Sequence, residues 1–95
     1  MQVTITFDPL KRDENLRKHG LDFLDAVPVF EGRTLDREDI RRDYGETRMQ
    51  TVGFLSGRMV MVVWTQVGSN TRRVISMRKC NAREQADYSD RFKEA

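Results

Sequence analysis

The stretch RRVISMRKCNAR, residues 72–83, predicts a strand that runs directly into the start of a helix. Strict alternation along this strand places Val74, Ser76 and Arg78 on one face. It places Arg73, Ile75 and Met77 on the other face. At least one arginine is therefore expected on a rigid element, as bidentate binding of phosphate requires. The stretch contains no acidic residue, and its basic side chains are Arg72, Arg73, Arg78, Lys79 and Arg83.

This basic stretch has two interpretations. A solvated sheet edge often carries arginine, which discourages edge pairing. Alternatively, the cluster binds phosphates, which makes an RNA or DNA backbone the leading partner class. Asn81 and Glu84 form a plausible capping pair for the last helix, and the free N–H groups at such a terminus attract phosphate. Tyr88 and Phe92 share one face of this helix.

Three strands are predicted before the last helix. The segments 48–55, 59–65 and 71–78 are separated by the turns Ser56-Gly57 and Gly68-Ser69-Asn70. Two tight turns in succession favour an antiparallel meander, with the nearly continuous apolar run 59–65 as its central strand.

The first half of the chain predicts a strand, two helices and a connector. Residues 2–7 alternate as a half-buried strand does. Asp8 followed by Pro9 is typical of a helix start, and this helix should end at His19 because Gly20 supplies a left-handed stop. A second helix begins after Asp22, and Pro28 should shorten it. Residues 31–46 form a charged connector with a possible short strand near 33–35. The expected core face of the second helix is formed by Phe23, Ala26, Val27 and Phe30.

Together these elements predict one α+β domain over residues 1–95, in the order β-α-α-β-β-β-α. Its small antiparallel sheet carries packed helices. The net charge is +2, but residues 1–46 hold 8 basic and 11 acidic side chains and residues 47–95 hold 9 and 4. Such asymmetry suits a protein with a separate basic working face. Cys80 is the only cysteine, which fits a reducing cytosol, and no apolar run suits a membrane helix.

His19 and Arg48 are further candidates for chemistry. His19 is the only histidine. It either rests at a helix C-terminus, where the dipole favours it, or moves protons near neutral pH. Lys18 beside it could hold a phosphate. Arg48 either forms a local ion pair with Glu46 or projects toward the basic groove. The acidic residues Asp36, Glu38, Asp39 and Asp43 are typical of a solvated loop, so no metal or other cofactor is expected.

The segments FDPLKRDENLRKHG, residues 7–20, and ISMRKCNAREQADY, residues 75–88, resemble the BrnT family of toxins from bacterial type II toxin–antitoxin systems. The two segments agree with the family in residue type, order and distance, and the resemblance spans nearly the whole chain. Met77 and Cys80 depart from it mildly. The matching residues include Asp8, Pro9, Lys11, Asn15, Lys18, His19, Gly20, Glu46, Arg48, Gly53, Ser76, Arg78, Glu84 and Tyr88.

The resemblance implies a RelE-like ribonuclease fold and cleavage of RNA that blocks translation in the cytoplasm. The implied partner is a BrnA-like antitoxin with a ribbon-helix-helix domain. The antitoxin would neutralise the toxin, and the pair would repress their own operon. Operator DNA would be contacted only through the antitoxin, and no membrane would be involved.

We expect a metal-independent endonuclease. Arg48 and Arg78 would stabilise charge on the phosphate, and His19, Glu84 and Tyr88 are the other catalytic candidates. The expected RNA-binding residues are Lys18, Arg73, Lys79 and Arg83. The alternative is a non-catalytic module that binds nucleic acid or docks an antitoxin.

Overall fold

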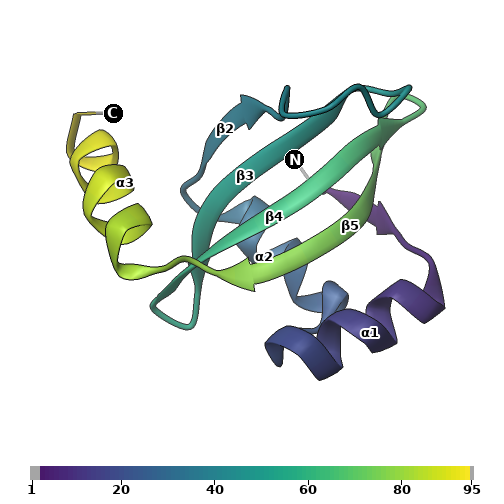
Figure 1. Cartoon of the computed structure of the whole chain (residues 1–95), viewed down its shortest axis with the longest axis horizontal. Coiled ribbons are helices and arrows are strands. Elements are labelled where there is room, and N and C mark those ends of the chain that lie inside the picture. The colour runs from purple at the N-terminus through teal and green to yellow at the C-terminus, as the bar shows by residue number, and fades with distance from the viewer. Residues whose placement is uncertain (1–2, 95) are drawn as a thin grey trace.

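The structure is a computed structural model that describes residues 3–94. The predicted first strand included Gln2, which lies outside the described residues. The chain forms an α+β fold, as predicted, with helices before and after a run of strands (Figure 1). The elements, in chain order, are β1 (Thr4–Thr6), α1 (Pro9–His19), the 3₁₀ turn η1 (Phe23–Asp25), α2 (Ala26–Glu31), β2 (Leu35–Glu38), β3 (Arg48–Leu55), β4 (Arg58–Val67), β5 (Thr71–Lys79) and α3 (Ala82–Glu94).

The strands form one sheet in the spatial order β1-β5-β4-β3-β2. β3, β4 and β5 pair antiparallel, which confirms the predicted meander. The connector contains a short strand, but β2 begins at Leu35, where the predicted strand of residues 33–35 was expected to end. β2 pairs with β3 at one edge of the sheet. β1 lies at the other edge and runs parallel to β5. The predicted sheet was purely antiparallel, so this part of the prediction is wrong. The parallel pair arises because the chain crosses from one edge to the other through α1 and α2 before the meander returns.

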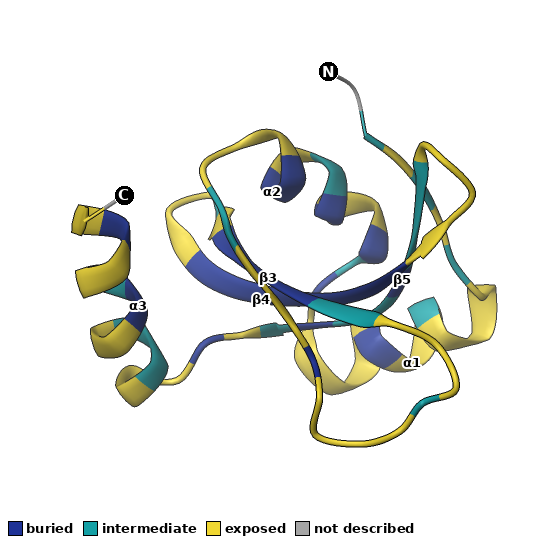
Figure 2. Ribbon diagram, turned by 90° about the horizontal axis from the view of Figure 1, so that it is seen from above, coloured by how far each residue is buried: buried dark blue, intermediate teal, exposed yellow. Residues whose placement is uncertain are grey.

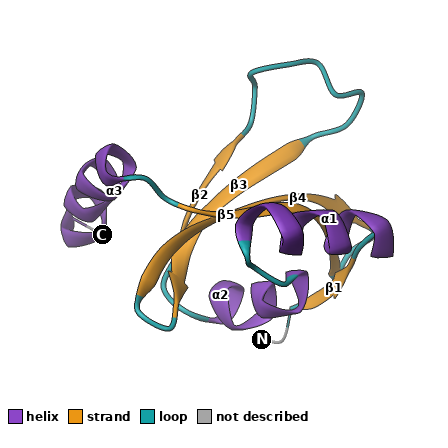
Figure 3. Ribbon diagram, turned by 60° about the horizontal axis from the view of Figure 1, so that its bottom comes forward, coloured by secondary structure: helices purple, strands orange, loops and turns teal. Residues whose placement is uncertain are grey.

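Side chains from different helices pack against the two faces of the sheet, and Figure 3 shows α3 apart from α1 and α2. On one face, called here the α2 face, apolar side chains of β4 and β5 pack against η1 and α2. On the opposite face, the α3 face, Tyr88 and Phe92 cover the end where β5 finishes. Their sheet neighbours there include Val52, Met59 and Met61. α3 thus leaves the other end of its face to polar side chains of β3 and β5.

The second predicted helix is divided into η1 and α2. Pro28 is the third residue of α2, where its missing N–H costs no helical hydrogen bond. Val29 is fully buried and Val27 only half-buried, so the predicted core position at Val27 is wrong. The break at η1 rotates α2 relative to one continuous helix. Figure 2 shows burial concentrated on the sheet and α2, whereas α1 and α3 are largely exposed.

Candidate functional site

A cationic groove runs between α1 and β5. It consists of two neighbouring depressions that share Lys11 and Ile75. One is also lined by Asp8, Arg48, Arg73 and Val74, and the other by Glu14, Asn15, Lys18, His19 and Ser76. We call the two together the α1 groove. Basic side chains outnumber carboxylates in its lining, which makes it suited to an anionic chain.

Helix α1 supplies one wall of this groove. Asp8 caps it by accepting a hydrogen bond from the Leu10 N–H at 2.9 Å, and Gly20 ends it with φ of 70°, both as predicted. Lys11, Asn15 and Lys18 lie four and three residues apart and therefore share one helical face.

Asn15 anchors α1 to the sheet. Its buried side chain donates to the Leu21 carbonyl at 3.1 Å and accepts the Met77 N–H of β5 at 3.0 Å. Leu10 and Leu16 of α1 are exposed. A polar clamp, rather than an apolar stripe, thus fixes the helical face that carries Lys11 and Lys18.

A β-bulge sets which side chains of β5 face the α3 side. Val63 of β4 pairs with Ser76, but the next residue, Trp64, pairs with Val74. Ile75 is therefore an extra residue in β5, and alternation restarts after it.

The bulge overturns the predicted faces of β5. Val74 and Met77 both pack in the core on the α2 face. Arg73, Ser76 and Arg78 pair with residues of β4 that point to the α3 face. The prediction that separated Arg73 from Arg78 is therefore wrong, since both lie on one face. Their partners in β4, Thr65 and Met61, are four positions apart, which is about 13 Å at ~3.3 Å per residue.

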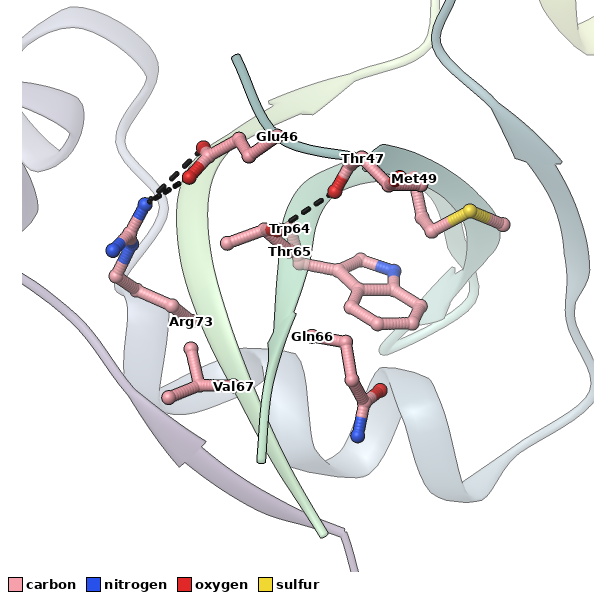
Figure 4. Close-up of a pocket in the computed structure, with 8 residues that line it drawn as sticks. All are labelled: Glu46, Thr47, Met49, Trp64, Thr65, Gln66, Val67 and Arg73. Carbon is pink, nitrogen blue, oxygen red and sulfur yellow. Dashed lines mark hydrogen bonds and ion pairs between the residues drawn. The ribbon is translucent and has the colours of Figure 1, made fainter. Parts of the chain in front are cut away.

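Glu46 joins the two arginines of the groove. One carboxylate oxygen lies 3.1 Å from Nε of Arg48. The other lies 2.9 Å from Nη2 of Arg73, a contact that Figure 4 shows. Hydrogen bonding from Arg48, supported by the charge of Arg73, lowers the pKa of Glu46. The structure thus contains the predicted ion pair between Arg48 and Glu46, and Glu46 forms a second ion pair with Arg73. A carboxylate held between two guanidinium groups marks a position where an anion is stabilised.

The loop between β2 and β3 orients Arg48. The guanidinium of Arg48 lies over the ring of Tyr44, 4.2 Å from its centroid. Tyr44 in turn donates its hydroxyl to Asp39 at 3.2 Å. Asp39 is buried and accepts two further hydrogen bonds from the Arg41 guanidinium, which is the main reason that its pKa is lowered.

Arg78 lies outside the α1 groove and is paired with Glu84. Its Nη1 and Nη2 each lie 2.7 Å from one oxygen of that carboxylate. These hydrogen bonds, together with the N–H of Asn81, hold the pKa of Glu84 at about 2. The predicted capping pair is confirmed, since Glu84 N–H also donates to Asn81 at 2.8 Å. A carboxylate with so low a pKa is a weak base, so Glu84 suits positioning of Arg78 better than proton transfer.

The remaining sequence candidates are not gathered in the groove. Tyr88 lies on the buried face of α3, among apolar residues such as Met61 and Cys80. Arg83 is exposed in the first turn of α3. Lys79 pairs with Val60, a residue of the α2 face, and so points away from the face of Arg78.

Two groups of the site were not predicted as functional. Lys11 lines both halves of the groove. Its helical spacing from Lys18 was a usable signal. Tyr44 touches Arg48 only because the loop folds back over β3. Within residues 3–94, no group of three His, Cys, Asp or Glu side chains gathers so as to hold a metal ion. The helices in this range are too short or too polar to cross a membrane.

The fold and the groove together define a class: a small α+β protein whose sheet and first helix line one groove with lysine, histidine and arginine. Residues 7–84 match the family described as the ribonuclease toxin BrnT of type II toxin–antitoxin systems. The chain belongs to this family of ribonuclease toxins. Membership implies RNA as the target and a protein antitoxin as the partner.

A solved structure agrees with this assignment. The chain is similar to the crystal structure of the Brucella abortus ribonuclease toxin BrnT, with 31% sequence identity and a TM-score of 0.65. The match covers 83% of this chain and 97% of the other. A comparison with curated proteins finds no match. The predicted family and fold class are thus confirmed.

Proposed function

We propose that this chain cleaves RNA without a metal ion, and that the cleavage inhibits translation in the cytoplasm. A ribose 2′-hydroxyl attacks the adjacent phosphorus, forming a new P–O bond while the bond to the 5′-oxygen breaks. The 2′-hydroxyl proton passes to a base, and a proton is delivered to the departing 5′-oxygen. The products are a cyclic phosphate and a free 5′-hydroxyl.

The observation that carries this proposal is the shared lining of the α1 groove by Lys11, Lys18, His19, Arg48 and Arg73. Arg48 and Arg73 would stabilise the charge that builds on the phosphate oxygens. Lys11 and Lys18 would hold the flanking backbone. His19 is the best group for proton transfer in the groove.

Arg78 would bind the RNA further along the same sheet face, with Glu84 orienting its guanidinium. Arg83 at the start of α3 would support that contact. Tyr88 would act by packing α3 rather than by touching RNA. Lys79, on the other side of the strand, would contribute only long-range charge.

We further propose that a BrnA-like antitoxin with a ribbon-helix-helix domain neutralises the chain by covering the α1 groove. Toxin and antitoxin together would repress their own operon, with operator DNA contacted through the antitoxin. Membership of a type II system supports an antitoxin partner. Co-purification, followed by an operon reporter with and without the chain, tests both statements.

The test of cleavage uses a matched pair of substitutions on α1. Lys18 lines the groove, whereas its neighbour Arg17 is absent from the lining. Each change to alanine removes one positive charge from an exposed helix position. Purified proteins are incubated with RNA in EDTA, and the ends of any fragments are analysed.

We expect discrete fragments with cyclic-phosphate ends from the wild type and from Arg17→Ala. Lys18→Ala should cut much more slowly, and His19→Ala should lose ~100- to 10,000-fold in rate, as loss of a proton-transfer group does. Stable, salt-sensitive RNA binding without fragments would instead favour the alternative, a non-catalytic binding module. Equal loss in Arg17→Ala and Lys18→Ala would show that only overall charge matters.

A further inference from the structure

A second depression, of about 600 Å³, opens beside the α1 groove (Figure 4). We call it the β4 notch. Arg73 belongs to the lining of both, and Glu46 in the notch contacts Arg48 in the groove. The notch is lined by Glu46, Thr47, Met49, Trp64, Thr65, Gln66, Val67 and Arg73.

The notch exists because β4 extends beyond β3. Their pairing stops at Arg48 opposite Thr65, so Gln66 and Val67 continue past the first residue of β3. Thr65 closes this corner by donating its hydroxyl to the Thr47 carbonyl at 2.7 Å. On their other side, Gln66 and Val67 pair with β5, which keeps the projecting strand end rigid.

The walls of the notch suit a flat aromatic ring with polar edges. Met49, Trp64 and Val67 provide apolar surface. Trp64 is held firmly, since its indole N–H donates to Thr51 at 2.7 Å and Arg72 lies 4.1 Å from its ring centroid. Gln66 is exposed, and its amide nitrogen donates one hydrogen bond to the Gly68 carbonyl at 3.0 Å. The second N–H and the amide oxygen can still bond to a ligand.

We infer that the β4 notch binds one nucleobase of the RNA, next to the phosphate held by Arg48 and Arg73, and thereby selects the base at that position. The inference rests on the proposed function. Phosphate contacts fix the register of a nucleic acid but carry no sequence information, whereas base contacts specify it. Because Arg73 borders both spaces, a phosphate bound on its groove side brings the attached nucleoside to the mouth of the notch.

The test uses short oligonucleotides with one ribonucleotide, so that only one phosphodiester can be cut. Each of A, C, G and U is placed on either side of that bond. Val67→Trp fills the notch, and Gln66→Leu removes the amide at nearly the same volume. Leu24→Trp is the matched control, because Leu24 is an exposed apolar residue on η1 outside both depressions. All-deoxy versions of the same oligonucleotides measure binding alone by fluorescence anisotropy.

We expect the wild type and Leu24→Trp to prefer one base by ~10-fold or more at one flank. Val67→Trp and Gln66→Leu should reduce that preference to about twofold or less while still cutting the favoured RNA. Cleavage without base preference, or a preference that survives both substitutions, would overturn the inference and leave the proposed function standing. Base-selective binding that Val67→Trp abolishes, in a protein that cuts nothing, would support the notch and refute the nuclease. Neither cleavage nor selective binding would refute both.

Discussion

Arg78 and Glu84 form a two-point contact: each terminal nitrogen of the guanidinium lies 2.7 Å from one oxygen of the carboxylate. The same carboxylate accepts the Asn81 N–H at 3.0 Å. The side chain of Glu84 therefore caps the start of α3 and also orients Arg78 at the end of β5. Such a contact restricts the guanidinium to one plane.

Replacing Arg78 with alanine should abolish growth arrest in cells while the protein still folds and binds antitoxin. The physical reason is the loss of a fixed cation from the sheet face that we propose binds RNA. Growth curves after induction, with antitoxin pull-down and circular dichroism as fold checks, measure this. Arg42→Ala, at an exposed loop position, should remain toxic. A fully toxic Arg78→Ala would show that Arg78 has no part in the function.

Protein stability should fall in acid because of Glu84. Its pKa is about 2 in the folded chain, below the ~4.3 of an unfolded glutamate. Between these values the unfolded chain binds more protons, so this contribution is complete above about pH 4.3 and is lost as the pH falls toward 2. Urea midpoints measured across this range should fall less steeply in Glu84→Gln than in the wild type. Parallel curves would contradict the folded-state contact.

Tyr44 should affect cleavage through Arg48. Tyr44→Ala removes the ring beneath the guanidinium, a contact worth ~0.5–1 kcal/mol, and should lower kcat/KM about two- to fivefold. Tyr44→Phe keeps the ring and should cut nearly as fast as the wild type, although it loses the hydroxyl contact with Asp39. Steady-state cleavage of one RNA compares the three proteins. A Phe variant as slow as the Ala variant would assign the effect to loop folding instead.

Asn15→Ala should lower the free energy of unfolding by ~1–3 kcal/mol, because it leaves the buried Met77 N–H and the Leu21 carbonyl without their partner. Urea denaturation gives this value directly. Glu14→Ala serves as the neighbouring control, since Glu14 is exposed and should change stability by less than ~0.5 kcal/mol. If the two variants unfold alike, α1 is not held by this clamp.

Alanine should destabilise the protein at Gly53 but be tolerated at Gly32. A Cβ at Gly53 would lie 2.8 Å from Cγ1 of the fully buried Val29 and 3.2 Å from Cγ2 of Thr34, so Gly53→Ala should cost ~1–3 kcal/mol. At Gly32 the nearest atoms are 3.6 Å away and φ is −89°, so alanine should be tolerated. Thermal melts of the two variants decide this, and an unchanged melting temperature for Gly53→Ala would mean that β3 and α2 can separate.

Local signals in the sequence were sufficient for several elements. The bounds of α1 follow from Asp8, Pro9 and Gly20, whose effects act over one helical turn. The start of α3 follows from the reciprocal bonding of Asn81 and Glu84. These interactions depend on nearest neighbours in the chain, so they can be inferred without knowledge of tertiary packing.

The rest depends on long-range geometry. The parallel pairing of β1 with β5 joins residues more than sixty positions apart, such as Thr4 and Thr71. The stacking of Tyr44 on Arg48 requires the loop to fold onto its own strand. Lys18, His19 and Arg48 all line the α1 groove, and the cleavage assays described above test the roles proposed for them.

Because Ile75 is an extra residue, the alternation of side chains between the two faces shifts by one position between the start and the end of β5. Arginines five positions apart in an even pleat would serve opposite surfaces, but here both serve the same one. If β5 lost the bulge but kept Ile75 in a regular pleat, composition and net charge would stay the same, but one of these cations would turn toward the hydrophobic interior. The placement of Arg73 and Arg78 on one face therefore depends on a single inserted residue, and a count of basic residues cannot reveal it.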